Sequence, residues 1–412
     1  MLRNGFRPWE NPGVKIDWIK VLEENIRKEN NWEEKIRNYV EEHAPEAERF
    51  LKELAVIPAP SGKEKRRGDF CRKWLEAHGA EGVYEDAAGN IIYPYEIRRR
   101  RRIVVYMAHL DVVFPDEDKL VIHQKNNVLT GPGVGDDTAN LVNLLMAAAF
   151  FAREKPDLQT GILFVADTGE EGLGNLKGCR QLIQDYGHRI AGVISFDLYL
   201  GQCFSQCVGS LRYEVTVHTE GGHSFSDFGN ASAIRQISQL VCALYDRQVP
   251  ERAQTTYNVG LMEGGTSVNT IAQEARILYE IRSVDAGCME EMRQYFMDTI
   301  HRFSADGMRL QITQVGERPC AGEVDGDCQA RLVETVSEVI HQVTGKEISL
   351  EAASTDANIP LSVGIPALTI GTIVGGRPHT REEWVDLDSQ RTGMKLVLNL
   401  IFALQESKDF FK

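Results

Sequence analysis

IVVYMAHLD, residues 103–111, is the stretch of sequence that decides the fold. Its first six residues are apolar and uncharged, and the run ends at His109 and Asp111. An unbroken apolar run bounded by polar residues is typical of a strand buried on both faces of a sheet. Residues two apart in a strand point to the same side, so we expect Asp111 to orient the imidazole of His109.

The same pattern occurs three more times along the chain. The further apolar runs and their polar ends are 161–166 with 167–171, 191–196 with Asp197, and 366–371 with His379. Helical periodicity lies between them, as over residues 138–155. Strands alternating with helices predict an α/β domain whose mixed, mostly parallel sheet is sandwiched by helices. Ligands bind beyond the carboxyl ends of strands in such sheets, so the polar ends are expected to meet there.

Residues 209–318 follow a different pattern. The alternation in RYEVTVH predicts a half-exposed strand. Strands are expected at 212–218, 255–262, 275–283 and 308–315, and helices at 231–246 and 289–303. This β-α-β-β-α-β order is that of a ferredoxin-like domain. We therefore predict an inserted α+β domain at 209–318 within a larger domain formed by residues 1–208 and 319–412.

Composition and charge exclude several classes of function. The formal net charge of −14 makes nucleic acid and membrane surfaces poor partners. The start of the chain shows no secretory signal, and the eight cysteines form no CxxC pair, so a cytoplasmic protein with reduced thiols is expected. The arginine run 98–102 is interpreted as a solvated turn, with nucleic-acid binding as the alternative. Ser61 and Glu64 have the spacing of a helix capping box.

Several polar motifs could carry chemistry, although each alone has an ordinary structural explanation. In GPGVGDD, residues 131–137, glycines allow a tight turn and Asp136 precedes a helix, but Asp137 could simply be an N-cap. Glu170 and Glu171 could divide metal binding and proton transfer between them, or form an exposed acidic loop. Two histidines and three carboxylates suffice to hold two divalent ions bridged by one aspartate. The candidate ligands are His109, Asp136, Glu171, Asp197 and His379.

Seven motifs together resemble one family of metallopeptidases. They are MAHLDVV, GPGVGDD, DTGEEG, SFD, GGHS, EIRS and GGRPHT. The family (metallopeptidase family 20) includes peptidase T, carboxypeptidase G, carnosinase, aminoacylase and succinyl-diaminopimelate desuccinylase. The resemblance covers residues 45 to 405 and implies hydrolysis of an amide bond in a small peptide or an N-acyl amino acid.

The resemblance also implies roles for the candidate ligands. His109 and Asp197 would bind one zinc ion, Glu171 and His379 would bind the other, and Asp136 would bridge the two. Cobalt and manganese are the alternative metals. The ions would lower the pKa of a water molecule and polarise the scissile carbonyl.

Further roles follow from the resemblance for residues that are not ligands. Glu170 would be the general base and Asp111 would hold the ring of His109. The inserted domain resembles a lid and dimerisation domain, so a homodimer is expected, in which His223 would reach the partner's active site and stabilise the oxyanion. Asn269 and Arg282 match substrate-binding positions. A turn histidine at 223 and a salt bridge within the lid at 282 stay open as alternatives.

Alternative activities differ in the features that would support them. Asp197, where relatives can have Glu, favours an aminopeptidase, tripeptidase or dipeptidase over a carboxypeptidase or an N-acyl amino acid amidohydrolase. Thr138-Ala-Asn140 replaces the Lys and Gly of many relatives, which leaves the details of the pocket open. A catalytically silent binding protein would be expected to lose Glu170, which is present. The acidic composition and the absence of a phosphate-binding lysine disfavour a two-metal phosphatase.

Overall fold

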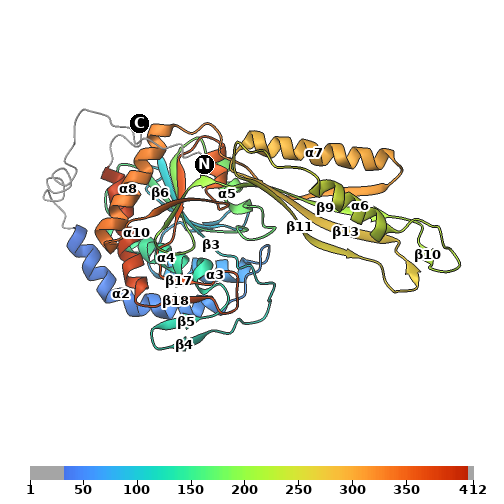
Figure 1. Ribbon diagram of the computed structural model, residues 1–412. Helices are drawn as coiled ribbons and strands as arrows, with labels where there is room; N and C mark the ends of the chain where they lie inside the picture. The colour runs from blue at the N-terminus through green and yellow to red at the C-terminus, as the bar shows by residue number, and fades with distance from the viewer. Residues whose placement is uncertain (1–31, 407–412) are drawn as a thin grey trace.

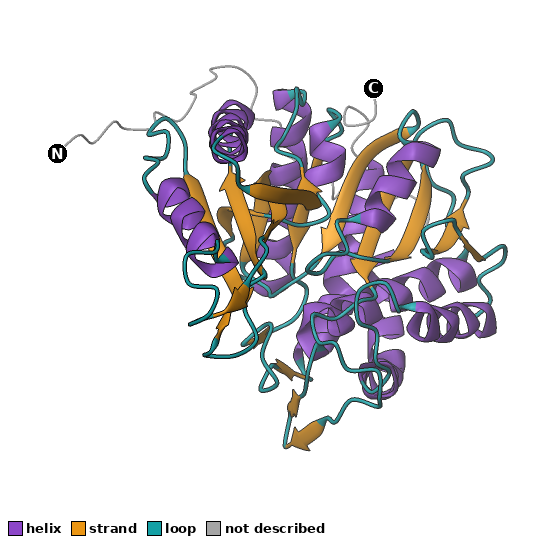
Figure 2. Cartoon of the chain, turned by 90° about the vertical axis from the view of Figure 1, so that its right-hand side faces the viewer, coloured by secondary structure: helices purple, strands orange, loops and turns teal. Residues whose placement is uncertain are grey.

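A computed structural model describes residues 32–406 of the chain. A broad unit built on a large sheet carries a long, narrow extension (Figure 1). Figure 2 shows the molecule from the side of this extension, with helices purple and strands orange. The start of the chain, where no signal sequence is expected, lies outside the described residues. Across the described part, no helix combines the length and the apolar character needed to cross a membrane.

The large sheet has eight strands in the order β1-β2-β6-β3-β7-β16-β8-β15. Their bounds are β1 Tyr84–Glu85, β2 Ile91–Tyr95, β3 Ile103–His109, β6 Gly161–Asp167, β7 Ile190–Phe196, β8 Gln202–Cys207, β15 Ser349–Ala353 and β16 Ala367–Ile370. The neighbours β6–β3, β3–β7, β7–β16 and β8–β15 run parallel, and the other three pairs run antiparallel. The predicted mixed α/β sheet is confirmed, although the strands β8 and β15 were not expected.

Both faces of this sheet are covered by helices, which explains the unbroken apolar run in β3. Val104 and Tyr106 belong to a core on one face and Val105 and Met107 to a core on the other. The helices with residues in the first core are α2 Trp32–Ala55, α3 Lys65–Ala77, α4 Asn140–Glu154, α8 Gly326–Thr344 and α10 Ser389–Glu406. The second core includes residues of α5 Lys177–Tyr186 and α9 Asn358–Ser362.

The extension, called the lid below, is a four-stranded antiparallel sheet in the order β11-β13-β9-β14. Its elements are β9 Gly209–His218, α6 Ala233–Tyr245, β11 Thr255–Gly264, β13 Glu274–Ser283, α7 Ala286–Ala305 and β14 Arg309–Arg318. Both helices share a core with the sheet. This arrangement is ferredoxin-like, as expected. A short ribbon of β10 (Gly222–His223) and β12 (Thr270–Ile271) lies at the far end of the lid (Figure 1). The domain limits 209–318 stay a prediction.

A second small sheet in the broad unit was not expected from the sequence. It has the order β17-β18-β5-β4, with β17 Gly375–Gly376, β18 Trp384–Asp386, β5 Val128–Thr130 and β4 His123–Lys125. Trp384 pairs with Thr130, and Gly131 N–H donates to the carbonyl of Glu383 at 2.9 Å. This pairing brings the glycine-rich segment 131–136 beside the loop that follows His379.

The predicted capping box is wrong. Helix α3 begins at Lys65, and no side chain caps its first turn. Ser61 Oγ instead donates to Asp111 Oδ2 at 2.6 Å, because that buried carboxylate needs hydrogen-bond donors. The arginine run 98–102 forms a turn between β2 and β3, in which Arg100 pairs with Asp157. All eight cysteines are unpaired.

Candidate metal centre

The five candidate ligands come from five separate stretches of chain. His109 is the last residue of β3, Asp197 follows β7 directly, and Glu171 lies four residues beyond the end of β6. Asp136 lies in the turn that precedes α4, and His379 lies in the loop between β17 and β18. The carboxyl ends of the adjacent parallel strands therefore supply three of the five side chains.

Asp136 lies between the two histidines. Its Oδ1 is 3.0 Å from His109 Nε2, and its Oδ2 is 3.2 Å from His379 Nε2. Asp197 Oδ1 lies 3.7 Å from His109 Nε2, and Glu171 Oε1 lies 3.4 Å from His379 Nε2. The five side chains thus form two groups that share Asp136, with one oxygen of that aspartate on each side.

Burial and hydrogen bonding together determine the pKa values of the side chains in this cluster. Burial, followed by the charge of Asp136, raises the pKa of Asp197 to about 8. Burial also raises the pKa of Glu171 to about 7. Hydrogen bonds to Asp136 and Glu171 raise the pKa of His379 to about 11. Although burial opposes it, bonding to the surrounding carboxylates raises the pKa of His109 well above its usual range. Burial therefore raises the proton affinity of the two carboxylates, and bonding to carboxylates raises that of the two histidines.

Two buried carboxylate oxygens in the cluster, Asp197 Oδ1 and Glu171 Oε1, have no close hydrogen-bond donor among the described residues. They lie 3.7 and 3.4 Å from the imidazole nitrogens of His109 and His379. An unpaired buried carboxylate oxygen is costly unless a cation faces it. Buried carboxylates outnumber buried cationic groups in this region. The buried carboxylates are those of Asp111, Asp136, Asp137, Asp167, Glu170, Glu171, Asp197 and Asp356. This donor set of imidazole nitrogens and carboxylate oxygens fits divalent cations such as zinc.

Asp137 also lies close to the candidate ligands, but both of its carboxylate oxygens already accept hydrogen bonds. His109, Asp137 and Asp197 offer ligand atoms within 4.8 Å of one another, as do His109, Asp136 and Glu171. The Oδ2 atom of Asp137 accepts the backbone N–H of His109 at 2.9 Å, and its Oδ1 accepts from Asn140 Nδ2 at 2.7 Å. Asp137 therefore stabilises the end of β3 by accepting the backbone N–H of His109.

Asp111 holds the loop that carries the paired glutamates. Its carboxylate accepts the backbone N–H groups of Gly169, Glu170 and Glu171 at 3.1, 3.1 and 2.9 Å. The ring of His109 contacts Asp111 mainly through the backbone, because Nδ1 lies 2.9 Å from the Asp111 carbonyl and 3.6 Å from Oδ1. Asp111 thus places the loop as well as the imidazole.

Glu170 lies beside the cluster and pairs with an arginine that the sequence did not single out. Arg318 Nη1 donates to Glu170 Oε1 at 2.9 Å, and Nη2 donates to the carbonyl oxygen of the same residue. Both residues are buried. Arg318 is the last residue of β14, where a charged residue at a strand end would ordinarily be taken as exposed.

Glu383 was also missed, because a charged residue next to a short strand would ordinarily be taken as exposed. Its carboxylate is fully buried and accepts the backbone N–H groups of Gly133, Gly135 and Asp136 at 2.9, 2.8 and 2.6 Å. Burial, followed by the charge of Asp136, raises the pKa of Glu383 to about 8. The only signal in the sequence is its place in REEW, shortly after His379.

The three candidate residues in the lid are not part of this cluster within one chain. His223 lies in β10 at the far end of the lid, where its Nδ1 accepts N–H groups of the following turn (Figure 1). Asn269 is exposed, and its Oδ1 accepts from Ser267 Oγ. Arg282 Nε donates to Glu280 Oε2 at 2.9 Å, so in this structure it forms a salt bridge within the lid.

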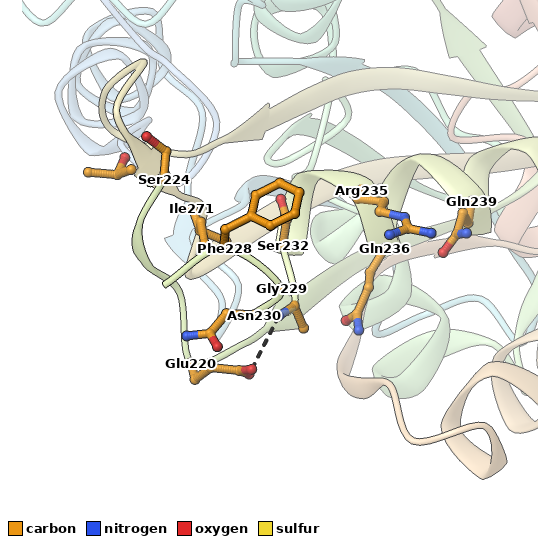
Figure 3. Close-up of a pocket in the computed structure, with 12 residues that line it drawn as sticks. Glu220, Ser224, Phe228, Gly229, Asn230, Ser232, Arg235, Gln236, Gln239 and Ile271 are labelled. Carbon is orange, nitrogen blue, oxygen red and sulfur yellow. Dashed lines mark hydrogen bonds between the residues drawn. The ribbon is translucent and has the colours of Figure 1, made fainter. Parts of the chain in front are cut away.

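The end of the lid is hollowed beside the ribbon that carries His223. A hollow of about 690 Å³ is lined by residues that include Ser224, Phe228, Arg235 and Ile271 (Figure 3). Phe228 is 90% exposed and the nearby Phe225 is 86% exposed.

Comparisons with known proteins identify similar sequences and structures. Residues 105–403 match the sequence profile described as Peptidase family M20/M25/M40. Succinyl-diaminopimelate desuccinylase of Corynebacterium glutamicum is 25% identical over 342 residues, which covers 80% of this chain and 89% of that protein.

Two solved structures share the fold. A tripeptidase from Staphylococcus aureus has a TM-score of 0.70 at 19% identity, covering 88% of this chain and 99% of that one. A di-peptidase from Saccharomyces cerevisiae has a TM-score of 0.71 at 15% identity, covering 91% of this chain and 98% of that one.

Proposed function

Because the chain belongs to peptidase family M20/M25/M40, a family of metallopeptidases and amidohydrolases, we propose that it hydrolyses a terminal peptide bond in small peptides. Aminopeptidase, tripeptidase and dipeptidase action are the forms that we favour. The observation that carries the proposal is the position of Asp136, whose two oxygens face His109 and His379 at 3.0 and 3.2 Å.

Two divalent cations, with zinc as the first candidate, would be held around Asp136. His109 and Asp197 would hold one cation, and Glu171 and His379 the other. Cations in such a site lower the pKa of water and polarise a carbonyl group. The buried oxygens of Asp197 and Glu171, which have no close hydrogen-bond donor among the described residues, support this assignment.

Glu170 would move the proton during hydrolysis. Its carboxylate takes a proton from the attacking water as the new carbon–oxygen bond forms. The same proton then passes to the amide nitrogen as the carbon–nitrogen bond breaks, so that the amine leaves neutral. The side chain lies in the loop fixed by Asp111, next to Glu171, which supports its access to the reacting atoms.

The lid would complete the site in a homodimer. We propose that His223 of the partner subunit donates a hydrogen bond to the developing oxyanion, and that Asn269 and Arg282 bind the substrate. Arg282 would exchange Glu280 for a substrate carboxylate, with which it can form a bidentate pair. A cytoplasmic homodimer with a lid domain at 209–318 is part of the same proposal.

Hydrolysis of N-acyl amino acids is the second candidate. The similarity to a desuccinylase supports it, because that protein is named for removing an acyl group from an amine. Both reactions need the same attacking water and the same carbonyl polarisation, so the metal centre does not separate them.

A substrate screen tests the proposal directly. Metal-free protein is incubated with zinc, cobalt or manganese and offered free di- and tripeptides beside N-acetyl and N-succinyl amino acids. We expect metal-dependent release of amino acids from the free peptides. Turnover of blocked substrates alone would favour the second candidate, and turnover of neither class would contradict both.

A further inference from the structure

The loop that carries Glu170 is fastened to the lid as well as to the large sheet. Arg212 in β9 donates to the carbonyl of Gly172. The backbone N–H of Glu317 in β14 donates to Asn175 Oδ1 at 2.8 Å, and its carbonyl accepts from Arg180 Nη2 at 2.6 Å. Two residues at the base of the lid, Arg212 and Glu317, thus link residues 172–180 to β9 and β14.

Arg318 makes the most buried of these contacts. It is 5% exposed, and its guanidinium bridges the Oε1 and the carbonyl oxygen of Glu170. Nη1 also donates to the carbonyl of Ser354 at 2.9 Å, which restrains the guanidinium further. Among the described residues, no donor is found for the second carboxylate oxygen, Oε2. That oxygen is therefore the one available to a water molecule.

The position of Arg318 in the chain ties it to the orientation of the lid. It is the last residue of β14 and pairs with Ser210 at the start of β9. The chain enters the lid through β9 and leaves it through β14, so these two strand ends connect the lid to the broad unit and are called the hinge below. Pro319 follows and restricts the backbone beyond the hinge. A rotation of the lid about these strands would displace the Arg318 guanidinium relative to Glu170.

We propose that Arg318 is a positioning residue for Glu170, through which the hinge of the lid sets the direction of the general base. This inference rests on the proposed function, since it gives Glu170 the role of base. The planar guanidinium binds the side chain and the main chain of one residue at once, which restricts the rotation of the carboxylate. The ammonium group of a lysine has no such planar pair of donors, so it cannot reproduce the restriction.

Variants of the full-length, zinc-loaded protein test this role. Arg318→Ala and Arg318→Lys are compared with Arg276→Ala, which removes a lid arginine paired with Glu263 and Glu214 on β11 and β9. The substrate is the peptide or acyl amino acid found by the screen. A base misplaced by about 1 Å lowers turnover by about 10²-fold, so we expect this loss of kcat in Arg318→Ala with KM and zinc content little changed.

Two further readouts separate positioning from general stability. Amide hydrogen exchange at residues 169–172 should increase in Arg318→Ala and stay unchanged in Arg276→Ala. Arg318→Lys should retain the melting temperature more closely than Arg318→Ala and recover only part of kcat. If Arg318→Ala does not fold, the lysine variant carries the test, because it keeps a cation beside Glu170.

A double-mutant comparison distinguishes failure of this inference from failure of the proposed function. Glu170→Ala should abolish nearly all turnover, and adding Arg318→Ala should then cause no further loss. If Arg318→Ala lowers turnover by the same factor with or without Glu170, Arg318 does not act through Glu170 and the inference is overturned. Equal kcat in Arg318→Ala and Arg276→Ala overturns it as well. Normal turnover in Glu170→Ala would instead remove the proposed base.

Discussion

Glu383 Oε1 accepts the backbone N–H of Asp136 at 2.6 Å, across 247 residues of sequence. The same carboxylate accepts the N–H groups of Gly133 and Gly135. Because Glu383 lies four residues beyond His379, one buried side chain joins the turn that presents Asp136 to the loop that presents His379. The placement of Asp136 between His109 and His379 therefore depends on a residue that is not itself one of the candidate ligands.

Removal of Glu383 should weaken both folding and metal binding. In Glu383→Ala, three buried N–H groups lose their acceptor, which we expect to lower the free energy of unfolding by about 3 kcal/mol. Misplacement of Asp136 should weaken zinc binding by about 10–100-fold. Thermal unfolding and isothermal titration measure these effects. Glu382→Ala, at the exposed neighbouring position, is the matched control and should change neither quantity.

Glu170 and Glu171 are adjacent, and their substitutions should have different consequences. Glu170→Ala should retain the metal content and lose turnover by about 10²–10⁴-fold, because only proton transfer is removed. Glu171→Ala should lose metal affinity, because it removes an oxygen that faces His379. Elemental analysis and steady-state kinetics of the two variants check this difference. Metal loss in Glu170→Ala would place that residue among the ligands.

Affinity for divalent cations should rise with pH. Burial raises the pKa of Asp197 to about 8 and that of Glu171 to about 7, so both carboxylates hold protons over a wider pH range than usual. Cation binding has to release these protons, and affinity therefore falls as the pH decreases through these values. Manganese titrations at about pH 6, 7 and 8, in buffers of different ionisation enthalpy, measure affinity and proton release. A constant affinity would show that neither carboxylate has to lose a proton.

The role of His223 in the partner's site can be tested by mixing two inactive variants. Glu170→Ala keeps His223, and His223→Ala keeps Glu170. Random pairing of equal amounts makes about half of the dimers mixed, each with one complete site of two, so about a quarter of the original activity should return. Activity is assayed after the subunits have exchanged. No recovery, although mixed dimers are detected by mass spectrometry, would mean that His223 acts within its own chain, and an active His223→Ala variant would mean that it has no catalytic role.

Residues that end buried strands could be located from the sequence alone. His109 and Asp197 follow apolar runs that have to lie in the sheet, and parallel strands bring their carboxyl ends to one edge. The strands and helices of the lid could also be predicted from the sequence, because the alternation along β9 and the helical periods of α6 and α7 are local properties of the sequence.

Contacts between distant segments could not be predicted in this way. Glu383 and Arg318 are charged residues at strand ends, and nothing local distinguishes them from solvent-exposed neighbours. Their roles depend on a small sheet of two- and three-residue strands and on the hinge of an inserted domain. Ser61 shows the opposite error, since its spacing from Glu64 predicts a helix cap, whereas its hydroxyl donates a hydrogen bond to the buried Asp111 carboxylate. The need of the distant, buried Asp111 carboxylate for a hydrogen-bond donor outweighed the local capping pattern of Ser61 and Glu64.

Anomalous X-ray diffraction from zinc-soaked crystals of the full-length protein tests the central claim most directly. We expect two zinc peaks, one on each side of Asp136, each about 2.0–2.2 Å from one of its carboxylate oxygens. One should be bound by His109 and Asp197, and the other by Glu171 and His379. Zinc at other side chains, with none of these five residues in contact with it, would contradict the account.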